Sequence, residues 1–133
     1  MSKATTEEKS YLIKMALHGS SYCISIGKGV VRALGEPSHV SLKISDSHDS
    51  ISVFPCDEDD VMAFRVPTKF LTDRHGAMRI HSKRFVHTIM SINNMETTGT
   101  YTLYGEYVKD KNIAVFSLVE GVTVRNLREP KQA

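Results

Sequence analysis

The feature that most constrains the fold is an alternation of apolar and polar residues in short runs. Val40, Leu42 and Ile44 alternate with polar residues, a polar turn covers 46–50, and the return run 51–54 stops at Pro55. Alternation with a period of two is typical of half-buried strands, because successive side chains of a strand point to opposite faces. The sequence therefore predicts a fold rich in β-hairpins.

The order strand, lysine, short helix and hairpin occurs twice along the chain. The parallel segments are 26–34 (IGKGVVRAL) with 80–89 (IHSKRFVHTI), Val40 and Leu42 with Tyr101 and Leu103, and 51–54 (ISVF) with 113–116 (IAVF). Such self-similarity predicts two related units. Neither unit, at ~50 residues, could bury a core alone. Two units side by side could close a small barrel with an approximate twofold axis. The alternative is chance, since short apolar alternations recur in unrelated sequences.

The predicted fold class is α+β, with two tandem β-α-β-β units that form a small pseudo-twofold β-barrel. An amphipathic helix is expected over 4–18, because Tyr11, Leu12, Met15 and Ala16 fall on one side, and Gly19 ends it. One compact domain is expected from these segments: N-terminal helix 1–19, first unit 20–60, connecting strand or linker 61–75, second unit 76–124 and flexible tail 125–133.

A set of apolar residues from both units is expected to form the core. It comprises Ile26, Val31, Leu34, Leu42, Val53, Phe54, Ile80, Phe85, Ile89, Leu103, Val115 and Phe116. Truncation of Phe54 or Phe116 to alanine is then expected to cost ~3–5 kcal/mol of stability.

Composition limits the class of protein. The chain has 133 residues, 41% of them hydrophobic and 24% charged, which is typical of one globular domain and excludes a fully disordered chain. No apolar run approaches the ~20 residues that cross a bilayer. The start of the sequence is polar, so no secretory signal is expected and a cytoplasmic location in a bacterial host cell is predicted. Cys23 and Cys56 are expected to be reduced, buried thiols, with a single disulfide as the minor alternative.

The charge is unevenly distributed. Residues 1–62 carry six Lys/Arg and nine Asp/Glu, whereas residues 63–133 carry eleven and six, for a net +2 overall. A basic cluster within 63–87 accounts for this: Arg65, Lys69, Arg74, Arg79, Lys83 and Arg84, with His75, His81 and His87 among them. Clustered cations attract phosphate or an acidic protein surface. The alternative is a solvated surface without a partner.

No catalytic constellation with suitable spacing is present. The sequence holds no P-loop, G-x-G-x-x-G, H-E-x-x-H or C-x-x-C. His75, His81 and His87 are six residues apart, which suits neither one helix face nor a zinc site. The acidic run 57–60 lacks the spacing and glycine of a calcium loop and predicts a turn. The triplet Ser47-His48-Asp49 is too compact for a catalytic triad. We expect a non-catalytic protein without metal or cofactor.

The first unit resembles the AbrB/SpoVT family of swapped-hairpin DNA-binding domains. The resemblance lies in Ile26-Gly27-Lys28, in Val31-Arg32-Ala33-Leu34-Gly35 and in the hairpin over 40–54. The second unit is similar through Gly76, Arg79, Ile80 and Lys83. Gly27 and Ser82 stand where the family has proline, and Ser20-Ser21 where it has Gly-Arg. The whole chain is also similar to small uncharacterised proteins of Firmicutes and their mobile elements.

The resemblance implies a DNA-binding transcription regulator in which basic side chains of the strand layer contact phosphates. Matching positions here are Lys28, Arg32, Arg79, Lys83 and Arg84, and the basic cluster adds Arg65, Lys69 and Arg74. Family members pair two chains in one barrel, whereas here one chain could supply both units.

The alternative function is that of an anti-defence inhibitor from a phage or mobile element. It would bind an acidic host protein or sequester a phosphorylated nucleotide. A monomer or a homodimer fits either hypothesis, and neither involves a membrane.

Overall fold

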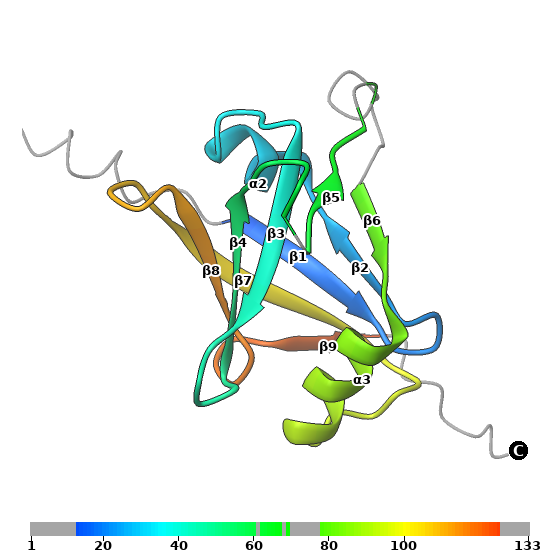
Figure 1. Ribbon diagram of the computed structural model, residues 1–133. Coiled ribbons are helices and arrows are strands. Elements are labelled where there is room, and N and C mark those ends of the chain that lie inside the picture. Colours follow the sequence, from blue (N-terminus) through cyan, green and yellow to red (C-terminus); the bar gives the residue numbers. More distant parts are fainter. Residues whose placement is uncertain (1–12, 61, 68, 70–77, 126–133) are drawn as a thin grey trace, which may run out of the picture.

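A single antiparallel sheet accounts for most of the fold. The computed structural model describes residues 13–60, 62–67, 69 and 78–125. The elements are β1 (Ile13–His18), β2 (Cys23–Ile26), α2 (Lys28–Ala33), β3 (His39–Ile44), β4 (Ser50–Pro55), β5 (Phe64–Arg65), β6 (Met78–His81), α3 (Lys83–Ile92), β7 (Thr100–Val108), β8 (Ile113–Ser117) and β9 (Thr123–Arg125). The strand order is β5-β3-β4-β8-β7-β1-β2-β6, with β9 beside β7. Figure 1 shows the sheet curling into a nearly closed barrel, which agrees with the predicted α+β barrel.

Strand β1 corrects the prediction of an N-terminal helix. Residues 13–18, the end of the predicted helix, form a strand whose burial alternates: Ile13, Met15 and Leu17 are buried and Lys14 is exposed. The stripe that suggested a helix shares only Met15 with the buried set, and the competing alternation Ile13-x-Met15-x-Leu17 is the one that pairing with two neighbouring strands selects. Residues 4–12 of the predicted helix lie outside the described residues.

Strand β1 joins two parts of the sheet. Met15 lies opposite Ile26 on β2 and opposite Leu103 on β7, and all three side chains are buried. Gly19 follows in the β1–β2 turn, where its N–H donates to the Gly99 carbonyl at 3.0 Å. A Cβ at Gly19 would collide with the Thr97 backbone, so this turn needs glycine.

The two helices lie toward opposite ends of the barrel in Figure 1. Helix α2 buries Val30 and Val31, and helix α3 buries Val86, Ile89 and Met90. The α3 N-terminus is capped by the Ser82 hydroxyl, which accepts a hydrogen bond from the Phe85 N–H at 3.3 Å.

The core fills the barrel interior and confirms most of the predicted core residues. Ile26, Val31, Leu34, Leu42, Val53, Ile80, Ile89, Leu103 and Phe116 are buried. The prediction is wrong for Phe54 and Val115, which are only half-buried and lie outside the core cluster. Phe85 is also half-buried and packs against the core from α3.

The two Ile-x-Val-Phe runs, which the sequence alignment treated as equivalent, have opposite burial. In β4 the buried residues are Ile51 and Val53, whereas in β8 they are Ala114 and Phe116. Ile51 lies opposite Phe116, and Val53 lies opposite Ala114. A shift of one residue moves a side chain to the other face of a strand. The parallel between these two runs is therefore one residue out of phase.

Prediction 1 concerns the two phenylalanines. Phe116 is fully buried, so Phe116→Ala should lower the free energy of unfolding by about 3–5 kcal/mol. Phe54→Ala should cost clearly less, because a half-buried side chain leaves a smaller cavity. Urea unfolding of both variants measures the two losses. Equal losses would contradict the observed strand phase.

Candidate functional site

The predicted site residues fall into several places. Lys28 begins α2 and Arg32 lies in its last turn, Arg65 lies on β5, and Lys69 follows it as an exposed residue. Arg79 lies on β6, while Lys83 and Arg84 form the first turn of α3. Arg74 lies outside the described residues. The basic cluster read from the sequence is therefore divided among different elements.

Four side chains that are basic or can be protonated lie close together along the chain, and each of them is exposed. Met78 and Ile80 of β6 point into the core, so Arg79 and His81 point outward and are exposed. Lys83 and Arg84 follow directly in α3 and are exposed as well. We name these four residues the β6–α3 face. Within the described part of the chain, no carboxylate forms an ion pair with Arg79, Lys83 or Arg84.

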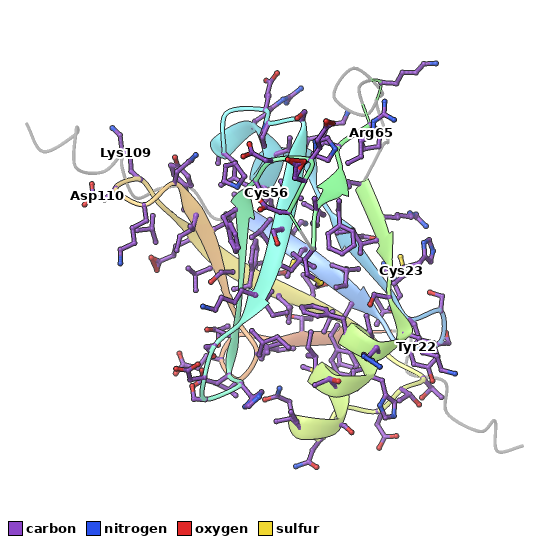
Figure 2. The ribbon with its side chains drawn as sticks, viewed as in Figure 1. Tyr22, Cys23, Cys56, Arg65, Lys109 and Asp110 are labelled. Carbon is purple, nitrogen blue, oxygen red and sulfur yellow. The ribbon has the colours of Figure 1, made fainter. Side chains whose placement is uncertain are left out.

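The β1–β2 hairpin borders the β6–α3 face. The Lys83 Nζ lies 5.5 Å from the centroid of the Tyr22 ring, within cation–π range. Tyr22 has a left-handed backbone, with φ of 50°, in the turn between β1 and β2. Ser25 of β2 lies directly opposite Arg79 of β6. Figure 2 shows Tyr22 and Cys23 on the β6 side of the molecule.

His18 of β1 is coupled to this surface. Its Nε2 lies 2.9 Å from the Ser25 Oγ, a hydrogen bond that joins β1 to β2. Burial, and secondly the nearby Arg79 charge, lower the pKa of His18 below 6.5. The ring is therefore neutral near pH 7 and can accept the serine proton. Hydrolytic sites contain a serine beside a histidine, but a catalytic triad also needs a third group that orients the histidine.

Both cysteines are free thiols, as expected. Cys23 is buried between His18 and His81 in the strand register. Burial raises the pKa of the Cys23 thiol, so the reactive thiolate is disfavoured. Cys56 corrects the prediction of burial, since it is half-buried, and its pKa is also raised, by burial and then by Asp60. In the described ranges no group of three or more His, Cys, Asp or Glu side chains could hold a metal ion.

Two sequence candidates are turns. Asp60 accepts a hydrogen bond at Oδ2 from the Asp57 N–H at 3.0 Å, which closes the acidic run as the predicted turn. Asp49 Oδ1 accepts from the Ser47 hydroxyl at 2.7 Å and from the Ser45 hydroxyl at 3.1 Å. These bonds, first that of Ser47, lower the pKa of Asp49. Asp49 thus stabilises the β3–β4 turn.

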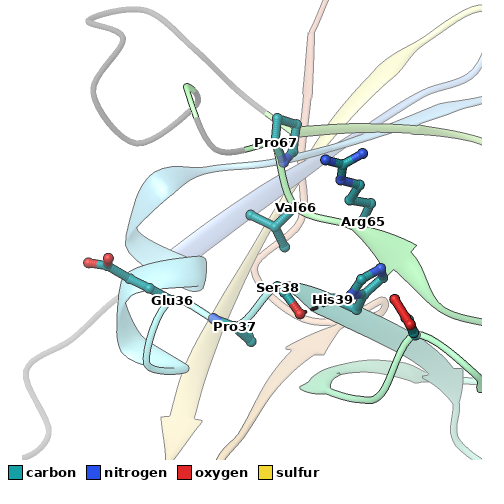
Figure 3. A pocket seen from close by; sticks show the side chains of 8 residues that line it. Glu36, Pro37, Ser38, His39, Arg65, Val66 and Pro67 are labelled. Carbon is teal, nitrogen blue, oxygen red and sulfur yellow. Dashed lines mark hydrogen bonds between the residues drawn. The ribbon is translucent and has the colours of Figure 1, made fainter.

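A groove lies where β3, β5 and the end of α2 meet (Figure 3). Its volume is about 770 Å³, and its lining is Glu36, Pro37, Ser38, His39, Glu58, Arg65, Val66 and Pro67. Arg65 of β5 lies opposite His39 of β3 in the strand register. The groove combines a guanidinium, an imidazole and two carboxylates, so it can form directed polar contacts with a ligand.

Sequence reasoning missed His18, Ser25 and the groove residue His39. The pattern Ile13-x-Met15-x-Leu17 could have revealed β1 as a strand and placed His18 on its outer face. No sequence pattern could have identified His39 as a groove residue, since the sequence does not show that β3 and β5 are neighbours.

Prediction 2 tests the state of His18. The pKa of His18 is lower in the folded chain than in the unfolded chain. As the pH falls through about 6.5, the unfolded chain therefore binds more protons at this histidine than the folded chain does. The wild type should therefore lose stability relative to His18→Gln as the pH falls from about 7.5 to 5.5. Urea unfolding of both proteins at each pH measures the difference, in which the other histidines cancel. A difference that stays constant with pH would contradict the lowered pKa.

Comparison of the chain with family models, with curated proteins and with solved structures gave no match. In the described part of the chain, no helix has the length and apolar character needed to span a membrane. The geometry of the β6–α3 face and of the groove is therefore the basis for the functional proposals.

Proposed function

We propose that the chain is a non-catalytic protein that binds double-stranded DNA through the β6–α3 face, as an AbrB-like transcription regulator. The observation that carries this proposal is that Arg79, Lys83 and Arg84, close along the chain, are all exposed and lack ion pairs with described carboxylates. Lys and Arg side chains on one surface neutralise phosphates and position a protein on the duplex. Arg79 can also bind a guanine edge through two hydrogen bonds.

The position of Lys83 and Arg84 on α3 supports an anionic partner. Both occupy the first turn of the helix, which contains no acidic residue. The helix N-terminus carries a partial positive charge, so cations there destabilise the helix by about 0.3–1 kcal/mol each. A phosphate beside the same turn would be attracted by the two side chains and by the helix end. This arrangement is unfavourable for folding and favourable for phosphate binding.

The strand pairing supports the proposed tandem units, with one change to their limits. Strand β1 of the first half pairs with β7 of the second, and β5 of the second half pairs with β3 of the first. The pairs β2·β6 and β4·β8 also join the halves. These reciprocal pairings fit two β-β-α-β-β halves, β1–β4 and β5–β8, related by an approximate twofold axis. Each proposed unit then begins one strand earlier than the sequence comparison suggested.

The proposed units favour the AbrB-like hypothesis over the anti-defence alternative. In the AbrB/SpoVT family, two chains each supply one unit, and the strand layer faces DNA. Here both halves would come from one chain. In the β2·β6 pair the second half supplies an arginine, Arg79, whereas the first half has Ser25 at the position opposite to it. The proposed DNA contact is therefore asymmetric and rests on the second half.

Prediction 3 tests DNA binding. Fluorescence anisotropy with a random-sequence duplex should show affinity that falls at least tenfold between about 50 and 200 mM salt. In the variant Arg79→Ala/Lys83→Ala/Arg84→Ala, affinity should fall and the slope of log K against log salt should decrease by about 3. The melting temperature should stay unchanged or rise slightly, because all three side chains are exposed and Lys83 and Arg84 oppose the helix dipole.

The matched control is Lys109→Ala/Lys111→Ala. Both lysines lie in the β7–β8 turn, and Figure 2 shows Lys109 on the opposite side of the molecule from Tyr22. This variant should keep the wild-type salt slope. Equal loss in both variants would indicate a general charge effect and contradict the assigned face. An absence of binding at low salt would contradict DNA as the partner and favour an acidic protein.

A further inference from the structure

We propose that the groove between β3, β5 and the end of α2 binds a short zwitterionic peptide, with its terminal carboxylate on Arg65 and His39. This inference goes beyond DNA binding and concerns different side chains from those of the β6–α3 face. Three properties of the groove support peptide binding: fixed walls, a carboxylate (Glu36) on the far side from Arg65 and His39, and an apolar floor.

The walls of the groove are fixed by backbone hydrogen bonds. The Val66 N–H donates to the Ser38 carbonyl at 2.8 Å, and the Cys56 N–H donates to the His39 carbonyl at 3.1 Å. On the other wall, the Glu36 N–H donates to the Val31 carbonyl at 2.9 Å and ties Glu36 to the end of α2. A preformed site loses less conformational entropy on binding.

One end of the groove is suited to a carboxylate. Arg65 is exposed and forms no ion pair with any described carboxylate. Its guanidinium can donate two parallel hydrogen bonds to the two oxygens of a carboxylate. The His39 Nδ1 lies 2.9 Å from the Ser38 Oγ, which occupies that nitrogen and leaves Nε2 for a ligand. Arg65 and His39 lie opposite each other on neighbouring strands, so both can reach one anionic group.

Glu36 is suited to a cation. Figure 3 shows Glu36 on the far side of Pro37 and Val66 from Arg65 and His39. Glu36 has a left-handed backbone, with φ of 53°, and follows Gly35 with φ of 90°. Glu58 is a second carboxylate of the lining. Carboxylates repel a polyanion such as a nucleotide, and Glu36 attracts the terminal ammonium of a peptide whose carboxylate lies on Arg65 and His39.

The middle of the groove is apolar. Val66 is buried and lies between the charged ends with Pro37 and Pro67. Aliphatic side chains of a bound peptide can pack on this floor. The volume of about 770 Å³ is within the range of small-ligand sites and holds several residues rather than one amino acid. Charge at both ends with an apolar centre is the pattern of an extended short peptide.

Prediction 4 tests the groove with tetra-alanine as the probe. In ¹H–¹⁵N correlation spectra of the full chain, tetra-alanine should shift the amide signals of residues 36, 38, 39, 58, 65 and 66. Arg65→Ala should weaken binding about tenfold, because a charged, doubly hydrogen-bonded contact is lost. C-terminally amidated tetra-alanine should bind the wild type as weakly as the free peptide binds Arg65→Ala.

Lys43→Ala is the matched control, since Lys43 is an exposed cation on the same strand as His39 and outside the groove lining. It should bind tetra-alanine like the wild type. N-acetylation of the probe should weaken binding to the wild type but not to Glu36→Gln. Shifts that are absent at millimolar peptide, or equal affinity for the free and amidated peptides, would overturn the proposal. So would binding of inorganic phosphate in place of the peptide. None of these outcomes depends on DNA binding.

Discussion

The pairing of β1 with both β2 and β7 is the constraint on which the rest of the structure depends. It places the β1–β2 hairpin beside the long strand β7, with β1 as the strand that pairs with β7. Met15, Ile26 and Leu103 therefore meet in the core. The same register fixes the outer face. It places His18 beside Ser25 and, through β2, places Ser25 opposite Arg79. The interior packing and the surface chemistry are thus consequences of one antiparallel register.

Local pattern predicted most of the elements correctly, because it depends on neighbouring residues. The β3–β4 and β7–β8 hairpins and helix α3 follow from alternation, turn residues and helical spacing. The failures occurred where distant partners decide. The segment 13–18 satisfied either period in isolation, and pairing with β7 made it a strand. Val115 belongs to an apolar run, 113–116, with no polar alternation, so only the β4·β8 register shows which of its side chains face the core. Phe54 follows the alternating run 50–53, which places it on the outer face with Ser50 and Ser52.

The sequence predicted the positive charge of the candidate site but not the spatial arrangement of its residues. Composition revealed a basic cluster within residues 63–87. It could not show that Arg65 on β5 faces His39 while Arg79 on β6 faces Ser25. These two strands are at opposite ends of the strand order, and their pairing partners are different. Arg65 therefore shares a groove with two carboxylates, whereas Arg79 shares a surface with cations. Two arginines of the same basic segment, Arg65 and Arg79, therefore lie in different chemical environments.

The basic residues at the start of α3 are not explained by the folding of the helix. Ser82 already caps the helix, and Val86, Ile89 and Met90 already bury its apolar side, so folding does not require basic residues in the first turn. Lys83 and Arg84 oppose the helix dipole. Burial, and secondly the Arg79 charge, lower the pKa of His18, so that neighbour adds little further charge near pH 7. In the proposed DNA complex, phosphates would neutralise Lys83 and Arg84 and so relieve their unfavourable interaction with the helix dipole. Under that proposal, the destabilisation in the free protein would contribute to the affinity for an anionic partner.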